Sequence, residues 1–195
     1  MRTSISWNDG FYSDRFSWLT GSLSYDLSKA SKLAFKAGGN LGKTAYHNLA
    51  TPLTNNSSIY DLIYTYTNGP WIVEPYVQYT SVPTNPNVGI LQGASTRGEA
   101  FLMTYKWNLR LALSGRAEHI ASTGNASEQA INLLYGPGSG AWSLTLTPTF
   151  QDRGFFVRGE VSLVWAVHYA AGDTFGREGI ARSQPRAAVE VGVMF

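Results

Sequence analysis

Charged side chains of both signs recur at close spacing in the second half of the chain. An arginine precedes a glutamate by two or four positions in three segments: Arg116 with Glu118, Arg158 with Glu160, and Arg186 with Glu190. Side chains on a β-strand alternate between two faces, so each of these pairs would share one face. One hypothesis is a charged pore lining, in which opposed signs set a transverse field that tunes ion selectivity. The alternative is a ladder of paired charges that fills a narrow interior.

The same face can be followed through earlier segments of the chain. We expect the charge ladder if ten strands close alone, and the pore lining if the barrel is larger. The candidate pore-lining residues are Lys32, Lys36, Asp61, Glu74, Arg110, Arg116, Glu118, Arg158, Glu160, Arg186 and Glu190.

Catalytic and metal-binding patterns find little support. The chain has no cysteine, and His47, His119 and His168 fall near predicted loops or strand ends without a zinc-binding spacing. An enzyme with a site at the rim would need a serine or a carboxylate beside His119 or His168. Residues 136–141 (GPGSGA) superficially fit a dinucleotide fingerprint, but the following segment alternates as a strand instead of opening a helix. We therefore predict no enzyme, no cofactor and no metal.

The final segment shows most clearly which elements carry these residues. Ala187, Val189, Val191, Val193 and Phe195 alternate with small, charged or neutral side chains. This pattern predicts a strand with one apolar side. The expected strands are residues 3–8, 15–25, 32–41, 57–66, 71–80, 97–107, 109–118, 142–150, 155–165 and 183–195, with a strand extension at 131–135. The strand at 97–107 has the least clear register, because both of its faces carry apolar residues.

Two regularities indicate that the expected strands form a membrane β-barrel. Expected connections alternate between short and long, as in outer-membrane barrels with short periplasmic turns and long outer loops. Aromatic residues also gather on the short-turn side, as in an interfacial girdle. The members of this set are Tyr25, Tyr66, Trp71, Tyr105, Trp107, Phe150, Phe155 and Phe195.

Composition agrees with this class. Charged residues make up 14% of the 195 residues, against about 25% in an average soluble domain. Mean hydropathy is −0.14, and no apolar window is long enough for a transmembrane helix. The net charge of +2 without a basic run gives no argument for nucleic acid. The alternative is a soluble β-sandwich or lipocalin-like barrel, in which the apolar face is the core.

The opening residues bear on export. Residues 1–10 contain no apolar stretch and no small-residue cleavage site, although an outer-membrane protein must be exported. We therefore expect a piece of a longer protein, specifically the C-terminal part of a larger barrel.

Several stretches resemble the bacterial outer-membrane family called "putative β-barrel porin-2" (OmpL-like). They are residues 6–13 (SWNDGFYS), 56–60 (NSSIY), 64–71 (YTYTNGPW), 133–139 (LLYGPGS) and 156–160 (FVRGE), with the terminal Phe195. The resemblance covers nearly the whole chain, and its motifs are structural. It implies a Gram-negative outer-membrane barrel that passes small hydrophilic solutes. It also implies that the C-terminal aromatic strand, ending at Phe195, is read by the barrel-assembly machinery.

Together these observations predict an all-β protein, an antiparallel transmembrane β-barrel of about ten meandering strands in one domain over residues 1–195. The predicted function is porin-like passive diffusion of small polar solutes or ions across the cell outer membrane. The expected partners are the lipid bilayer, the barrel-assembly machinery, the solutes and a homo-oligomer, with no nucleic acid. The alternative is a non-conducting structural or surface barrel, or a truncated fragment of a larger porin.

Overall fold

Ten strands follow one another along the chain. The computed structural model describes residues 1–10, 15–42 and 52–193. The strands are β1 (Arg2–Asn8), β2 (Trp18–Asp26), β3 (Ser31–Asn40), β4 (Ser58–Asn68), β5 (Trp71–Val82), β6 (Ala94–Lys106), β7 (Leu111–Ser122), β8 (Gly140–Asp152), β9 (Phe155–Val167) and β10 (Ser183–Val193). Helical turns α1 (Pro52–Asn55), η1 (Pro86–Val88) and η2 (Ala126–Glu128) lie in the connections. Among the described residues, none of these is a helix long and apolar enough to cross a membrane.

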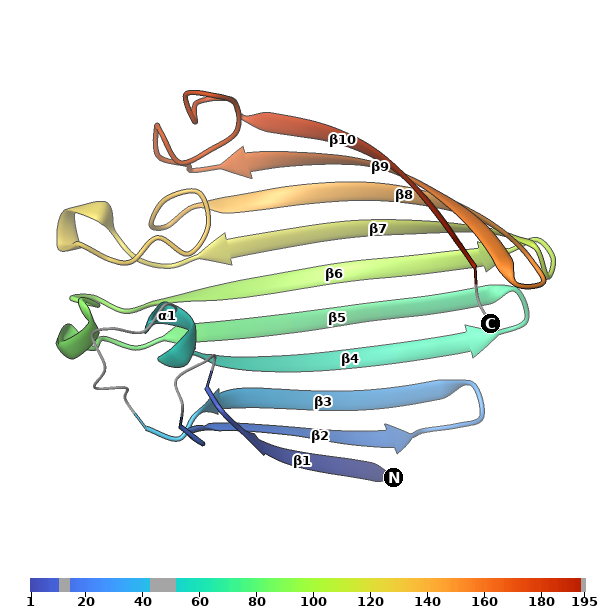
Figure 1. Cartoon of the computed structure of the whole chain (residues 1–195), viewed down its shortest axis with the longest axis horizontal. Coiled ribbons are helices and arrows are strands. Elements are labelled where there is room, and N and C mark those ends of the chain that lie inside the picture. Colours follow the sequence, from blue (N-terminus) through green and yellow to red (C-terminus); the bar gives the residue numbers. More distant parts are fainter. Residues whose placement is uncertain (11–14, 43–51, 194–195) are drawn as a thin grey trace.

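The strands form one antiparallel sheet in chain order, from β1 to β10. The sheet is a single curved layer, with the start of β1 and the end of β10 at the side of the short turns (Figure 1). In the described part of the chain β1 pairs only with β2, and β10 only with β9, so the sheet stays open. The predicted all-β meander is confirmed.

Connections alternate in length, as the sequence predicts. Residues 27–30, 69–70, 107–110 and 153–154 form short turns at one end of the sheet, and 9–17, 41–57, 83–93, 123–139 and 168–182 form long connections at the other. One of the short turns depends on a glycine. Gly69 takes a φ of 56° between β4 and β5, a conformation that glycine adopts without a steric penalty.

Each strand presents two different faces, which we call outward and inward. The outward face carries the apolar side chains, and one row across neighbouring strands is Pro75, Phe101, Ala117, Leu144 and Leu163. Many of these side chains are exposed, including Leu144 at 50% and Val161 at 57%. A soluble sandwich would bury this face under a second layer. The described strands form one layer only, so no second layer of strands covers this face.

Hydrogen bonds tie the long connections to one another. The Asn85 side chain donates to the side-chain oxygen of Asn56 at 3.0 Å, which joins residues 83–93 to 41–57. The Gln92 side chain donates to the Glu128 carboxylate at 2.7 Å, which joins 83–93 to 123–139. Residues 83–93 are thus bonded to described residues of both neighbouring connections at this end of the sheet, which we call the rim.

One predicted element is wrong. Residues 131–135 form no strand extension, and residues 133–135 form bends. The Asn132 side chain accepts hydrogen bonds from the backbone N–H groups of Leu134 and Gly136, at 3.1 and 2.9 Å. An asparagine that bonds its own neighbouring backbone competes with strand pairing, and this decides the local structure.

Candidate functional site: the polar inward face

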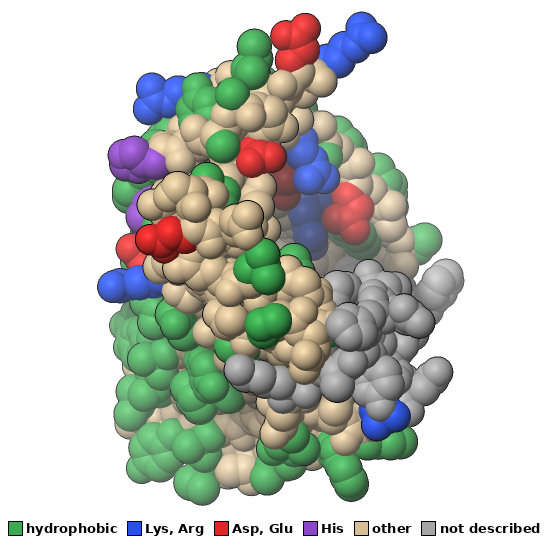
Figure 2. All heavy atoms as spheres, turned by 90° about the vertical axis from the view of Figure 1, so that its left-hand side faces the viewer, with side chains coloured by type: hydrophobic (Ala, Val, Ile, Leu, Met, Phe, Trp, Pro, Cys, Tyr) green, Lys and Arg blue, Asp and Glu red, His purple; other side chains and the backbone are tan. Residues whose placement is uncertain are grey.

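The register places ten of the candidate pore-lining residues on one face. On β5, Glu74 lies opposite Leu102 of β6, which in turn lies opposite Arg116 of β7. The same row continues through Thr145 and Ser162 to Arg186 on β10. Seen from the rim of long connections, acidic and basic side chains gather in the hollow of the curved sheet (Figure 2). The inward face is therefore the polar and charged face of the sheet.

Glu118 is the most connected carboxylate of this face. Its Oε1 accepts a hydrogen bond from the Tyr76 hydroxyl at 3.0 Å. Its Oε2 accepts one from the Ser143 hydroxyl at 2.8 Å and lies 3.2 Å from Nε of Arg116. Three partners on β5, β7 and β8 thus hold one half-buried carboxylate. Charge-assisted bonds of this kind are stronger than neutral ones, so the geometry of this cluster is well fixed.

A hollow of about 350 Å³ adjoins this cluster on the inward face. Its lining includes Tyr76, Gln78, Glu118 and Tyr135. Tyr135 comes from the connection 123–139, and its ring packs edge-on against Phe175 of the connection 168–182, with ring centroids 5.0 Å apart. Burial raises the pKa of the Tyr135 hydroxyl above its ordinary value. The connection 123–139 therefore places an aromatic ring beside the polar hollow, and Phe175 of the connection 168–182 packs against that ring.

The inward face combines paired and unpaired charges. Arg116 lies 3.2 Å from Glu118 on its own strand, whereas Arg158 lies 3.3 Å from Glu190 on the neighbouring strand. Asp61 accepts a hydrogen bond from Gln78 at 2.8 Å, and Glu74 accepts one from Thr65 at 2.9 Å. Among the described residues, these candidates make no ion pair within 4.0 Å: Lys32, Lys36, Glu160 and Arg186. The face therefore has features of both the charge ladder and the pore lining.

Arg110 lies away from the rest of the set. It stands in the turn before β7, with its Nε 3.2 Å from the Asp152 carboxylate. The predicted start of this strand at Leu109 is wrong by two residues. The Asn108 side chain accepts hydrogen bonds from the N–H groups of Arg110 and Leu111, at 2.8 and 2.9 Å. This turn geometry delays the strand and leaves Arg110 at the end of the sheet.

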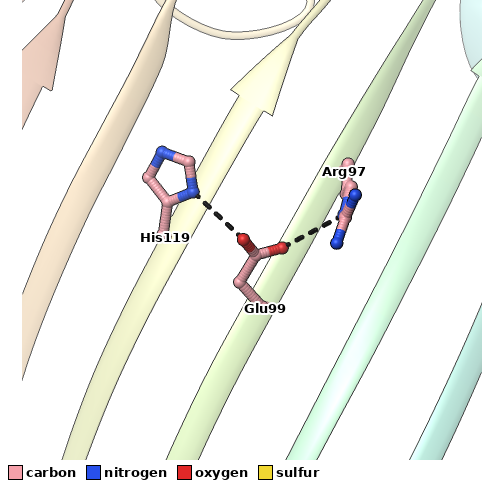
Figure 3. A network of polar contacts seen from close by, with 3 residues as sticks. All are labelled: Arg97, Glu99 and His119. Atoms are coloured by element: carbon pink, nitrogen blue, oxygen red, sulfur yellow. Dashed lines mark hydrogen bonds and ion pairs between the residues drawn. The ribbon is translucent and has the colours of Figure 1, made fainter.

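A second polar cluster lies on the outward face, where the sequence analysis placed no site. Arg97 and Glu99 on β6 and His119 on β7 are joined by two contacts (Figure 3). Nε of Arg97 lies 3.4 Å from Glu99, and Nδ1 of His119 lies 3.4 Å from the other Glu99 oxygen. The His119 ring lies over Trp142, with centroids 4.4 Å apart. The sequence does carry a signal for this cluster. Arg97, Glu99 and the apolar Phe101 follow one another at intervals of two residues, so they lie on the same face of the strand.

The Glu99–His119 pair bears on the alternative of an enzyme with a rim site. That alternative expects a serine or a carboxylate beside His119, and Glu99 is such a carboxylate. A nucleophilic triad also needs a hydroxyl on the second ring nitrogen. In the described part of the chain no serine or threonine hydroxyl is hydrogen-bonded to His119. The pair thus provides the base and its orienting carboxylate without a nucleophile.

The other sequence motifs lie in connections. His168 directly follows β9 with a φ of 52°, whereas His47 and Phe195 lie outside the described residues. Residues 136–139 form bends and a turn that lead directly into β8, so the interpretation of this motif as a loop is confirmed. Among the described residues, no group of three His, Asp or Glu side chains is arranged to hold a metal ion.

The fold and its two faces define the class: an antiparallel meander with an apolar outward face and a polar inward face, as in porin-like β-barrels. The model of the protein family described as "putative β-barrel porin-2, OmpL-like" matches residues 1–195. The chain belongs to this family, as the resemblance of its motifs predicts. No curated protein matches the chain.

Proposed function

We propose that the chain works as a porin-like β-barrel of the cell outer membrane that lets small hydrophilic solutes or ions diffuse passively. One observation carries this proposal: ten consecutive strands separate an exposed apolar face from a polar, charged face. In a membrane the first face contacts lipid and the second lines water. Membership of a family described as porins supports the same function.

The proposed mechanism needs no bound cofactor and no catalytic group. Solutes exchange hydrogen bonds between water and the inward hydroxyl and carboxylate groups, so they cross without entering hydrocarbon. Charges of both signs, such as Arg116 and Glu160, set the local field along the path. The connections that carry Tyr135 and Phe175 narrow the mouth. Permeation is then selected by solute size and by the balance of lining charges.

Such a pore needs both sheet edges to be paired. Each unpaired backbone N–H or C=O group in hydrocarbon costs about 2–7 kcal/mol. The proposal therefore requires partners for β1 and β10, either each other or strands from another segment. The barrel-assembly machinery, recognising a C-terminal signal at Phe195, is the partner that would bring about this closure. A homo-oligomer of closed barrels is compatible with the apolar outward face.

The test has two stages. The chain is first refolded in detergent and run on a gel with and without boiling, because a closed barrel changes mobility on heating. The folded protein is then added to a planar bilayer. Discrete conductance steps would support the pore. A heat-modifiable protein without any conductance would contradict it.

The open sheet favours one second candidate. A structural barrel segment that does not conduct by itself, or a fragment of a larger porin, explains why β1 and β10 both have free edges in the described part of the chain. This candidate predicts aggregation without a mobility shift on heating. The same gel therefore separates the two candidates before any bilayer is used.

A further inference from the structure

The two edge strands of the sheet each have one side that is not paired with another strand. Among the described residues β1 pairs only with β2 and β10 only with β9, and these two strands lie at opposite borders of the curved sheet (Figure 1). Their apolar side chains are largely uncovered: Ile5 is 82% exposed, Val189 75% and Val191 61%. An exposed edge of this kind is a template for pairing with a further strand.

The strands of the sheet are staggered, and the observed register shows by how much. The row of directly opposite residues that starts at Arg2 passes through Tyr76 and Glu118 and reaches Gln184 on β10. Arg2 is the first residue of β1, at the end of the short turns, whereas Gln184 is the second residue of β10, at the rim. When such a sheet closes, Arg2 therefore meets a residue that lies further along β10 than Gln184, by the full stagger of the sheet.

This stagger decides which residues of β10 can lie beside β1. Barrel strands tilt by about 35–45° and lie about 4.8 Å apart, so ten strands displace the row by about 34–48 Å, or about 10–14 residues along a strand. The lower value, about ten residues, pairs the largest part of β1. Residues 3–8 then lie opposite residues 193–188, and the pairing is antiparallel because β1 and β10 run in opposite directions.

In this register the side chains of the two strands match on both faces. Ile5 and Val191 both belong to the outward face and lie opposite each other, so an apolar pair forms there. Ser6 and Glu190 both belong to the inward face, where the hydroxyl lies within reach of the carboxylate. A shift by one residue would instead place Ile5 opposite Glu190 and reverse the two faces. The edges of β1 and β10 are therefore complementary to each other.

The room inside the barrel favours a second copy over closure of a single chain. A barrel of about eight strands is filled by its own side chains, whereas about 16–18 strands leave an aqueous channel. The inward face of this sheet carries long side chains, among them Tyr76, Arg116 and Arg158, which would fill a barrel of ten strands. Two sheets of ten strands give twenty, an even number that keeps all neighbours antiparallel.

We propose that two copies of this chain share one barrel, in which β10 of each copy pairs with β1 of the other about a twofold axis along the pore. The two seams contain the same residues, so two copies pair all of their edge strands and the ring closes. Both copies point the same way, and all long connections therefore lie at one end. The inference rests on the proposed pore, since the passage of solutes sets the width that the barrel needs.

Disulfide formation across the seam tests this pairing. The chain contains no cysteine, so introduced cysteines are its only thiols. One chain carries Ile5→Cys, a second chain with a longer tag carries Val191→Cys, and the two are refolded together in detergent and oxidised. Because opposite residues have Cβ atoms about 5 Å apart, we expect a covalent dimer of the two chains on a denaturing gel without reductant.

The matched control moves one cysteine along the same face of β10. Ala187→Cys lies about 14 Å from the proposed partner of Ile5, so its combination with Ile5→Cys should give at least tenfold less of the covalent dimer. Equal yields from Ala187→Cys and Val191→Cys would overturn the proposed register and with it the seam.

A chain that carries both Ile5→Cys and Val191→Cys separates a second copy from closure within one chain. Covalent dimers support the second copy. A disulfide formed within a single chain would show that ten strands close alone and would overturn the proposal. The absence of a disulfide in every combination would also overturn it, because the edges then need strands from a different segment.

The unsubstituted chain gives a measurement that does not depend on these variants. Native mass spectrometry of the refolded, heat-modifiable protein should find two chains in each particle, and particles of one chain would contradict the second copy. Conductance in a planar bilayer keeps this inference apart from the proposed function. A covalent dimer that does not conduct would contradict the proposed function alone, whereas a conducting single chain would contradict the second copy alone.

Discussion

The Tyr76 hydroxyl on β5 donates a hydrogen bond to Glu118 on β7 across the whole width of β6. The residue of β6 between them is Ala100, which lies opposite both and is 7% exposed. Adjacent strands lie about 4.8 Å apart, so the bond bridges roughly 10 Å of backbone. Only a small side chain at position 100 leaves room for this bridge.

Replacing Tyr76 with phenylalanine tests the bridge. The free energy of unfolding in detergent should fall by about 1 kcal/mol, because one hydrogen bond to a carboxylate is lost while Ser143 and Arg116 still hold Glu118. Urea titration followed by tryptophan fluorescence measures the change. Tyr60→Phe, the same change on the outward face, is the control and should have almost no effect. Equal effects of the two variants would argue against the bridge.

Adjacent residues of β9 test the assignment of faces. Val161 lies on the outward face and Ser162 on the inward face. Val161→Arg should destabilise the protein in lipid vesicles by about 2–4 kcal/mol, because it places a charge near the middle of the hydrocarbon. Ser162→Arg, one position away, should change stability far less because its side chain meets water. Comparable losses for both variants would contradict the proposed lipid and water faces.

Arg116 tests whether the inward charges act on permeating ions. Arg116→Gln removes a positive charge and leaves Glu118 without its ion-pair partner. The reversal potential under a salt gradient should therefore shift toward cation selectivity. The matched change Arg97→Gln lies on the outward face and should not move the reversal potential. A shift for Arg97→Gln without a shift for Arg116→Gln would contradict the inward face as the lining of the pore.

Tyr135 gives a prediction for high pH. Burial raises the pKa of its hydroxyl above the ordinary 10.0, so the folded state keeps a proton that the unfolded state loses. The resulting stability is present below pH 10 and is lost as the pH rises through the folded pKa. The free energy of unfolding of the wild type should therefore fall more steeply with rising pH above about pH 10 than that of Tyr135→Phe. An equal pH dependence of the free energy of unfolding in the two proteins would contradict the raised pKa of this hydroxyl.

Alternation within each strand is a local property, and the sequence predicts it well. For example, Val189 and Val191 lie together on the outward face of β10, as their alternation with other residues predicts. The exception was the strand over residues 97–107, whose two apolar faces hide its register. Here the apolar Ala100 and Leu102 face inward while the charged Arg97 and Glu99 face outward, so the polarity of these side chains does not identify the two faces.

Pairing between strands depends on register, which the sequence does not specify as clearly. Arg158 and Glu160 share one face, but Glu190 lies directly opposite Arg158 on the neighbouring strand. Opposite residues have Cβ atoms about 5 Å apart, closer than next-nearest neighbours along a strand. The cross-strand partner therefore takes the ion pair. The Tyr76–Glu118 bridge escaped prediction for the same reason, since it depends on the registers of three strands.

An even number of strands has a consequence for the two chain ends. Because β1 starts opposite Ser24, near the short turns, and β10 ends opposite Phe155, the start of β1 and the end of β10 lie at the same end of the sheet. In the proposed membrane barrel, fluorescent or protease-cleavable tags fused to either terminus would therefore report on the same compartment, opposite to the one that residues 83–93 and 123–139 face. Any strands inserted between β10 and β1 to complete a cylinder must therefore come in even numbers if neighbours are to remain antiparallel.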